Sequence, residues 1–266
     1  MRQAPMPAVF IGHGSPMNAL AGSRFGTRWH ALGRTLPRPR AIVCVSAHWY
    51  TRGTAVTMME RPKTIHDFGG FPPALYEVEY PAPGDPKLAA RVIELLAGIR
   101  VAADVSEWGL DHGTWSVLKH VYSEADIPVV QLSIDGTQPL AYHYELAKLL
   151  APLRDEGVLV VGSGNVVHNL RVMRAADAEP YPWAVRFNAS VRSRLIAQEH
   201  ATLANVAALG EDAALSIPTP EHYLPLLYVI ALQRADDSLQ FMVDGIELGS
   251  IGMMSIAIGT GLKEGP

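Results

Sequence analysis

Short apolar runs rich in β-branched residues alternate along the chain with longer segments of helical length. Apolar runs bounded by Gly, Pro or polar clusters predict strands, whereas apolar residues spaced three or four apart predict helices. The strongest predicted strands are Ala8–Ile11, Ala41–Ala47, Val129–Ile134, Val158–Gly162 and Ser255–Gly259, with weaker ones at Val101–Val105 and Phe241–Val243. The predicted helices are Phe25–Leu36, Pro86–Leu96, Trp115–Tyr122, Pro139–Arg154, Pro182–Gln198 and Pro220–Gln233.

This alternation indicates the fold class. Strands separated by helical lengths favour β-α-β units around a mostly parallel sheet. The runs AIVCVSA and VLVVGSG are almost uniformly apolar before their small residues, which is typical of strands covered on both faces. No Ser-, Gly- or Pro-rich linker divides the chain. We therefore expect an α/β fold with a central, mostly parallel or mixed sheet flanked by helices, in a single domain spanning residues 1–266.

The segment Arg61–Pro86, called the aromatic loop below, does not follow this alternation. It contains six prolines and three glycines, a density that excludes long regular elements. It also contains four Phe and Tyr side chains, too many for a plain linker. We expect a structured loop over a ligand pocket, with His66, Phe71 and Tyr76 as candidate substrate contacts.

Composition narrows the class of protein. The chain has 266 residues, of which 48% are hydrophobic and 18% charged, so it can bury a substantial core. A net charge of -4 without a basic run argues against a nucleic-acid partner. No segment has the roughly 20 continuous apolar residues that span a bilayer, and the N-terminus has no signal-peptide pattern. The single cysteine, Cys44, lies in a predicted strand and is interpreted as a buried apolar residue. A cytoplasmic enzyme without a membrane partner is expected.

Four histidines follow apolar or glycine-bearing segments that lie far apart in the chain: His13, His48, His168 and His222. His13 follows AVFIG and His48 follows AIVCVSA, so both lie at the carboxyl ends of predicted strands. Ligands bind at that edge in open α/β sheets. Neutral imidazole is the commonest metal ligand, and distant strand ends can surround one ion. Together the four histidines predict a metal site.

Two assignments stay open on residue patterns alone. Thr219 and Pro220 predict a helix start, which places Glu221 and His222 in the first turn. The helix dipole there favours a neutral imidazole, but a carboxylate also suits a divalent ion, so either residue can be the ligand. His168 is either a fourth ligand or an acid/base beside the metal.

His112, in GLDHGTW, is a further candidate for the site. Asp111 precedes it and is a candidate for setting the tautomer of a nearby histidine. Rival motifs are weak: GSGN lacks the lysine and spacing of a phosphate-binding loop, and Ser163 does not stand in a Gly-x-Ser-x-Gly pattern. The sequence contains no H-E-x-x-H.

Several long segments carry a family resemblance. They run in unbroken order from about Met6 to Gly261 and read GHGSPMNAL, LPRPRAIVCVSAHWYTRGT, TIHDFGGFPPALYEVEYPAPG, WGLDHGTWSVL, DIPVVQLSID, LRDEGVLVVGSGNVVHNLR, PYPWAVRFN and TPEHYLPLLYV. In this order they resemble the class III extradiol dioxygenases of the LigB-like superfamily. The resemblance is strongest to the 4,5-DOPA extradiol dioxygenase family.

The resemblance implies a metal-dependent oxidoreductase that opens a catecholic, DOPA-like ring with dioxygen. It implies His13, His48, His168 and His222 as metal ligands and His168 and His112 as catalytic acid/base residues. Fe(II) is the expected catalytic metal, and Zn(II) is expected to fit the same site. The family pattern favours His222 over Glu221, although related protocatechuate-cleaving enzymes use a glutamate.

Two other classes of function remain as alternatives. One is a zinc-dependent hydrolase, because an open histidine site can activate water. The other is a noncatalytic metal-binding or interaction protein on the same scaffold. The physiological catechol and the oligomeric state are not indicated by the sequence.

Overall fold

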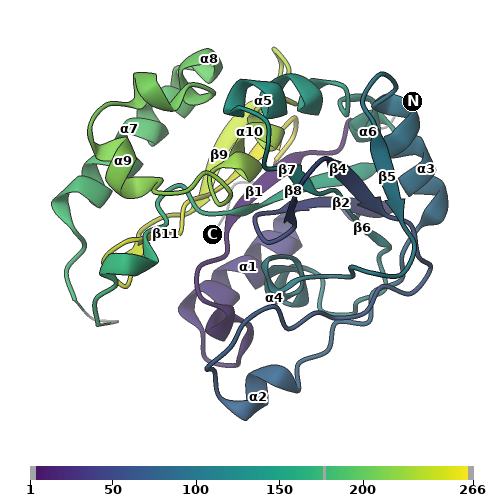
Figure 1. Cartoon of the computed structure of the whole chain (residues 1–266), viewed down its shortest axis with the longest axis horizontal. Helices are drawn as coiled ribbons and strands as arrows, with labels where there is room; N and C mark the ends of the chain where they lie inside the picture. The colour runs from purple at the N-terminus through teal and green to yellow at the C-terminus, as the bar shows by residue number, and fades with distance from the viewer. Residues whose placement is uncertain (1–3, 176–177, 263–266) are drawn as a thin grey trace.

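The computed structural model describes residues 4–175 and 178–262, which are arranged around a six-stranded sheet of order β6-β2-β8-β1-β12-β9 (Figure 1). Strands β6, β2, β8 and β1 run parallel, whereas β12 is antiparallel to β1 and β9 is antiparallel to β12. These strands are β1 (Ala8–Gly12), β2 (Ala41–Ser46), β6 (Val129–Gln131), β8 (Val158–Gly164), β9 (Ser238–Val243) and β12 (Ser255–Gly259). The predicted α/β fold with a mixed, mostly parallel central sheet is confirmed.

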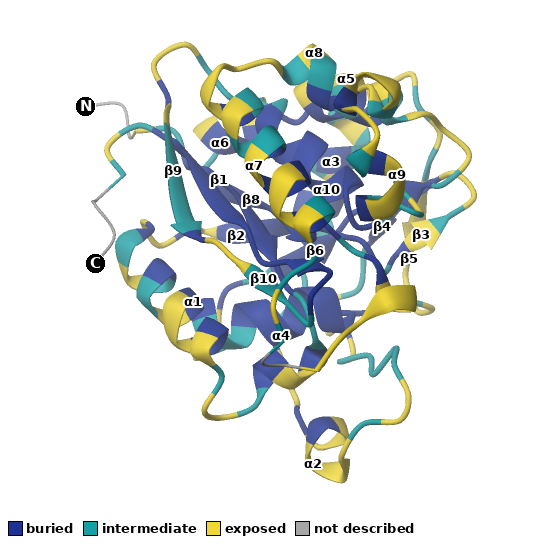
Figure 2. Cartoon of the chain, turned by 90° about the vertical axis from the view of Figure 1, so that its left-hand side faces the viewer, coloured by how far each residue is buried: buried dark blue, intermediate teal, exposed yellow. Residues whose placement is uncertain are grey.

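Helices cover both faces of this sheet, as the uniformly apolar strands predict. Alternate residues of β1 illustrate the two faces: Phe10 belongs to one hydrophobic cluster and Val9 to the other. The first face packs against α5 (Leu140–Lys148), α6 (Pro152–Asp155) and α10 (Leu224–Ile230), and the second against α1 (Arg24–Thr35) and α4 (His112–Val121). The central strands are buried along their length (Figure 2).

The remaining elements are short or lie outside the central sheet. Three two-stranded sheets pair β3 (Tyr50–Thr51) with β7 (Ile134–Asp135), β4 (Thr54–Thr57) with β5 (Val101–Asp104), and β10 (Ile246–Glu247) with β11 (Ile251–Gly252). The further helices are α2 (Pro73–Tyr76), α3 (Pro86–Leu95), α7 (Pro182–Ile196), α8 (His200–Leu203) and α9 (Asp212–Ser216). Three 3-10 helices are η1 (Pro16–Ala19), η2 (Leu170–Val172) and η3 (Val206–Leu209).

Two predicted elements are divided. The helix predicted at Pro139–Arg154 is α5 followed by α6, because Pro152 has no N–H to continue the helical hydrogen bonds and instead begins the second helix. The strand predicted at Val129–Ile134 is β6 followed by β7. Between them the chain leaves the central sheet, since the Ser133 N–H donates to the carbonyl of Ala55.

A third predicted element begins later than expected. The helix predicted to start at Pro220 is α10, which begins at Leu224 with Pro225 in its first turn. His222 therefore lies in the turn before the helix, and its predicted place in the first helical turn is wrong. The Thr219 hydroxyl does not cap a helix and donates to the carboxylate of Glu221 at 2.7 Å.

The aromatic loop is a structured segment that contains the short helix α2. Near its start it is tied to the beginning of α4. The Ile65 N–H donates to the carbonyl of Leu110, the Leu110 N–H donates to the carbonyl of Lys63, and the indole N–H of Trp115 donates to the carbonyl of Ile65. These bonds place the loop beside the carboxyl edge of the central sheet.

None of the helices in residues 4–175 and 178–262 is long and apolar enough to cross a lipid bilayer. The cytoplasmic location stays a prediction. The single domain over residues 1–266 also stays a prediction, and its two ends lie outside the described residues.

Candidate metal centre and substrate cavity

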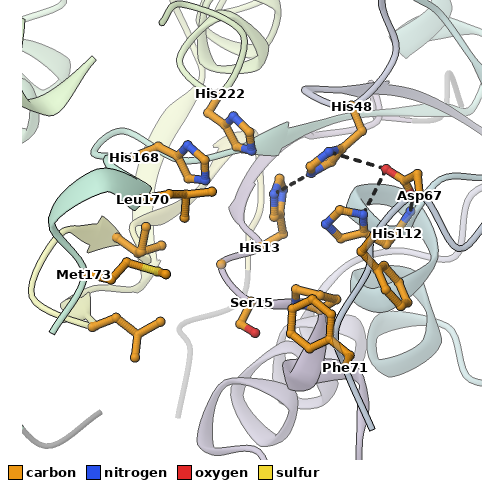
Figure 3. A pocket seen from close by; sticks show the side chains of 15 residues that line it. His13, Ser15, His48, Asp67, Phe71, His112, His168, Leu170, Met173 and His222 are labelled. Carbon is orange, nitrogen blue, oxygen red and sulfur yellow. Dashed lines mark hydrogen bonds and ion pairs between the residues drawn. The ribbon is translucent and has the colours of Figure 1, made fainter. Parts of the chain in front are cut away.

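Five histidines from distant parts of the chain converge at the carboxyl edge of the sheet (Figure 3). His13 follows β1, His48 follows β2, and His112 is the first residue of α4. His168 lies beyond the end of β8, and His222 precedes α10. Because β1, β2 and β8 are parallel neighbours, their carboxyl ends lie side by side and bring the residues that follow them together.

In the described residues, two groups of side chains have ligand atoms within 4.8 Å of one another: His13, His48 and His112, and His168, Glu221 and His222. His13, His48 and His222, drawn from both groups, have similar ring-to-ring spacings. The ring centroids are 5.0 Å apart for His13 and His48, 5.3 Å for His13 and His222, and 5.0 Å for His48 and His222. Two imidazoles bound to one divalent ion at about 2.1 Å, with roughly 90–109° between the bonds, have centroids about 4.5–5.2 Å apart. The spacing of the three rings is therefore close to that of ligands sharing an ion.

The tautomer of His13 follows from its hydrogen bonds. Its Nδ1 lies 3.0 Å from Ser163 Oγ, whose single hydrogen is donated to the carbonyl of Gly113 at 2.5 Å. Ser163 must therefore accept from Nδ1, which then carries the hydrogen of the neutral ring. The lone pair is left on Nε2.

His48 and His222 each have a carboxylate oxygen near Nδ1, where His13 has a hydroxyl oxygen. The Nδ1 of His48 lies 3.4 Å from Asp67 Oδ2, and the Nδ1 of His222 lies 3.2 Å from Glu221 Oε1. Carboxylates accept hydrogen bonds, so His222 Nδ1 is the donor to Glu221 and its Nε2 keeps the lone pair; Asp67 favours the same tautomer for His48. The Nε2 of His222 is buried without a hydrogen-bond partner among the described residues.

Electrostatics favour a cation between these nitrogens. Burial and the neighbouring imidazoles lower the pKa of His13 and His222 well below the ordinary value, and lower that of His48 to about 3. The rings are therefore neutral at pH 7. The Nε2 atoms of His13 and His48 are 3.1 Å apart. When both rings carry their hydrogen on Nδ1, two lone pairs face each other at this distance, and a divalent ion would relieve their repulsion. The donor set thus fits a metal such as Fe(II) or Zn(II).

The other two histidines flank this group. The His112 ring lies 3.8 Å from that of His48, and its Nδ1 is 3.0 Å from Asp67 Oδ2. The His168 ring is stacked on that of His222, with centroids 3.4 Å apart and planes inclined by 9°. Burial lowers the pKa of His168 to about 4. Asp67, His48 and His112 lie on one side of the centre and His168 and His222 on the other (Figure 3).

A cavity of about 380 Å³ opens onto all five histidines. Apart from Asp67, the side chains that line it beside the histidines are largely apolar and include Phe68, Phe71, Leu170, Met173, Leu248 and Ile251. This composition suits an aromatic ligand that presents polar groups at one end.

The structure divides the predicted substrate contacts. Phe71 lines the cavity, whereas His66 and Tyr76 do not. The Nε2 of His66 bonds to the carbonyl of Val78, and both His66 and Tyr76 pack against Phe68, whose ring contacts that of His112. In this arrangement Phe68 separates them from the histidines.

Sequence reasoning missed Asp67 as part of the site and assigned its place to Asp111. Asp111 is buried, but it accepts from Ser46, Gln131 and the Thr114 N–H and makes no hydrogen bond to a histidine in the described part of the chain. The sequence offered only one signal for Asp67, a lone acidic residue in the otherwise aromatic stretch IHDFGGF. Leu170 and Met173 carried no signal.

Comparisons with known proteins identify the family of the chain. The family model described as the catalytic LigB subunit of aromatic ring-opening dioxygenase matches residues 26–237. A 4,5-DOPA dioxygenase extradiol from Escherichia coli (strain K12) is 55% identical over 263 residues, which cover 97% of each chain. Proteins of the same name from Beta vulgaris and Portulaca grandiflora are 38% and 37% identical. The match to the Beta vulgaris protein covers 82% of this chain and 83% of that protein, and the match to the Portulaca grandiflora protein covers 93% and 94%.

A solved structure is similar to this chain as well. The crystal structure of an uncharacterized protein from Escherichia coli K12 superposes with a TM-score of 0.85 at 51% identity, covering 96% of this chain and 100% of that one. The resemblance expected from the sequence is thus confirmed over nearly the whole chain. The chain belongs to the LigB family of class III extradiol dioxygenases, oxidoreductases that open aromatic rings, and is a homologue of the 4,5-DOPA extradiol enzymes.

Proposed function

We propose that this dioxygenase opens the ring of a catechol with a DOPA-like side chain, using Fe(II) held by His13, His48 and His222. The observation that carries the proposal is the shared geometry of these three rings. The rings are spaced about as ligands of one ion are, and each has an acceptor near its Nδ1, which would leave Nε2 free to bind the ion. Bound Fe(II) supplies the redox chemistry that joins dioxygen to the ring, and Zn(II) fits the same donors without that chemistry.

Of the four predicted ligands, His168 is assigned to proton transfer. Its ring is stacked on that of His222 and lines the substrate cavity, a position suited to contact the substrate. The choice between Glu221 and His222 falls on His222. The Glu221 carboxylate already accepts from Thr219 and faces His222 Nδ1, whereas His222 Nε2 has no partner in the described structure.

The two flanking histidines are suited to handle the protons of the diol. Burial lowers the pKa of His168, so its ring is neutral at pH 7 and has a nitrogen lone pair that would accept a proton of the catechol and return it as the ring opens. His112 lines the other side of the cavity and is assigned a hydrogen bond to the second oxygen. Proton transfer at two ends of the diol requires two such groups on opposite sides.

The apolar walls are assigned to hold the ring and exclude water. Phe68 contacts the His112 ring, Phe71 lies on the same side, and Leu170 and Met173 lie on the side of His168 (Figure 3). No Lys or Arg is among the described residues that line the cavity, so recognition rests on the diol and the ring rather than on a substrate carboxylate. The side chain of a DOPA-like substrate would then extend toward the open mouth.

The test is an oxygen-electrode assay after anaerobic loading with Fe(II). Catechols with DOPA-like side chains should consume oxygen and give a yellow ring-opened product, while the Zn(II)-loaded protein serves as the matched control and should consume none. His168→Ala should keep its Fe(II) but lose turnover by about 10²–10⁴-fold, the range for losing an acid/base residue. Loss of the metal instead would make His168 a ligand.

The alternatives predict other results. A zinc-dependent hydrolase would be active with Zn(II) without oxygen uptake, and a noncatalytic binding protein would turn over nothing with any metal. Absence of oxygen uptake across a catechol panel, with stoichiometric Fe(II) bound, would contradict the proposed function.

A further inference from the structure

Asp67 contacts two of the five histidines at once. Its Oδ2 lies 3.0 Å from His112 Nδ1 and 3.4 Å from His48 Nδ1, and its Oδ1 accepts from the His112 backbone N–H at 2.8 Å. Ser163 and Glu221 also stand behind proposed ligands, but each contacts one imidazole. Asp67 alone among these three acceptors joins a proposed metal ligand to a proposed acid/base residue.

The Asp67 side chain is largely buried against the two imidazoles. It is 15% exposed, and its nearest basic side chains in the described structure are these two histidines. A carboxylate can only accept hydrogen bonds, so its position beside the two Nδ1 atoms favours the tautomers that carry hydrogen on Nδ1.

Asp67 is also the point at which the aromatic loop reaches the site. The residues before it are bonded to the start of α4 through Lys63, Ile65 and Leu110. The residue after it, Phe68, lines the cavity. A shift of the Asp67 carboxylate therefore moves the loop wall and the two histidines together.

We propose that Asp67 is a positioning residue that holds His48 and His112 with hydrogen on Nδ1 and couples metal binding to the order of the aromatic loop. This inference rests on the proposed metal-dependent function. A cation bound to His48 Nε2 would make its Nδ1–H a stronger donor to Asp67, and this contact would hold the loop that follows. The same carboxylate leaves His112 Nε2 with its lone pair.

Asp67→Asn tests the tautomers with little change in shape. The amide keeps one oxygen for the His112 backbone N–H, but its NH₂ group then faces the two Nδ1 atoms as a donor. Both rings are driven to carry hydrogen on Nε2, where His48 can no longer bind a metal. Loss of such an acceptor behind a metal ligand weakens affinity by about 10–100-fold.

The first measurement is the Zn(II) dissociation constant by chelator competition, with folding checked by circular dichroism. Asp67→Asn should bind about 10–100-fold more weakly than wild type. Asp67→Glu, which keeps the acceptor, should bind more tightly than Asp67→Asn. Glu77→Gln removes the same charge from an exposed position of the same loop and should bind as wild type does. Wild-type affinity in Asp67→Asn, or an equal loss in Glu77→Gln, would overturn the proposal.

Two measurements do not depend on an enzyme assay. In the Zn(II)-loaded wild type, ¹⁵N NMR of the imidazoles should place the hydrogen of His112 on Nδ1. A hydrogen on Nε2 would refute the role assigned to Asp67. This test uses the wild type alone, so it holds even if Asp67→Asn does not fold. Zn(II) should slow hydrogen exchange in residues 68–76 of the wild type and leave it unchanged in Asp67→Asn. Equal slowing in both would refute the coupling. These results are independent of oxygen uptake, so they stand apart from a failure of the proposed dioxygenase reaction.

Discussion

Removing the Ser163 hydroxyl tests whether the site is built from hydrogen bonds behind the imidazoles. The hydroxyl accepts from His13 Nδ1 at 3.0 Å and donates to the carbonyl of Gly113 at 2.5 Å, and Ser163 is fully buried. Ser163→Ala leaves both partners without this bond in a place that water does not reach. It also frees His13 to move its hydrogen to Nε2.

The expected magnitude follows from the two groups left unpaired. Each buried polar group without a partner costs about 1–3 kcal/mol, and because the two share one hydroxyl we expect a total of about 2–4 kcal/mol. For a chain of this length 1 kcal/mol shifts the Tm by about 2–4 °C, so the Tm should fall by about 4–16 °C. Zn(II) affinity should fall by about 10–100-fold, because His13 loses the acceptor that sets its tautomer.

The assay combines urea denaturation of the apoprotein with chelator competition for Zn(II). Ser116→Ala is the matched control, since Ser116 is 1% exposed and its hydroxyl has no hydrogen-bond partner among the described residues. Removing that unpaired hydroxyl should be neutral or stabilising. If Ser163→Ala and Ser116→Ala have equal stability and affinity, the hydrogen-bond relay contributes nothing and the reasoning about tautomers fails.

Two further predictions concern packing and pH. A Cβ at Gly164 would lie 2.2 Å from the carbonyl oxygen of His222, so Gly164→Ala should displace His222, lower stability by about 1–3 kcal/mol and weaken Zn(II) binding. Gly69→Ala, where a Cβ meets nothing within 4 Å, is its control, and equal Zn(II) affinity in the two would contradict the argument. Burial lowers the pKa of His143 from 6.5 to about 4. As the pH falls, His143 therefore gains a proton in the unfolded chain before it does in the native chain. The stability that the neutral ring contributes above pH 6.5 is lost as the pH falls toward 4. Urea denaturation at several pH values measures this loss. His143→Gln should reduce the fall in the free energy of unfolding between pH 6.5 and 4 by up to about 3 kcal/mol, and an unchanged pH dependence would refute the assignment.

The sequence predicted the sheet well because its strands are buried on both faces. A strand such as β8 is apolar at every position from Val158 to Val161, so its pattern depends little on which neighbours it meets. Boundaries were predicted less well where tertiary contacts decide them. The segment after β6 leaves the sheet because Ser133 bonds to Ala55, a residue far away in the chain, and no local pattern contains that contact.

His13, His48 and His168 could be predicted to lie together because they follow apolar strands, and parallel strands bring their carboxyl ends to one edge. Their acceptors were not found for the opposite reason. Ser163 is 150 positions from His13, and Asp67 reaches His48 and His112 from a loop whose path is set by prolines and backbone bonds. Asp111 was expected to set the tautomer of a nearby histidine because it directly precedes His112 in the sequence. In the structure, its side chain caps α4 and accepts a hydrogen bond from Ser46.

The dipeptide Glu221-His222 illustrates why composition alone leaves ligand identity open. Both side chains suit a divalent ion, and in the sequence they differ by one position. In the structure the chain turns so that the Glu221 carboxylate lies behind the imidazole, receives the Thr219 hydroxyl and faces Nδ1 at 3.2 Å. Because the acceptor occupies Nδ1, Nε2 is left for the cavity. The two residues thus have complementary positions, and replacing Glu221 should weaken metal binding without removing a ligand.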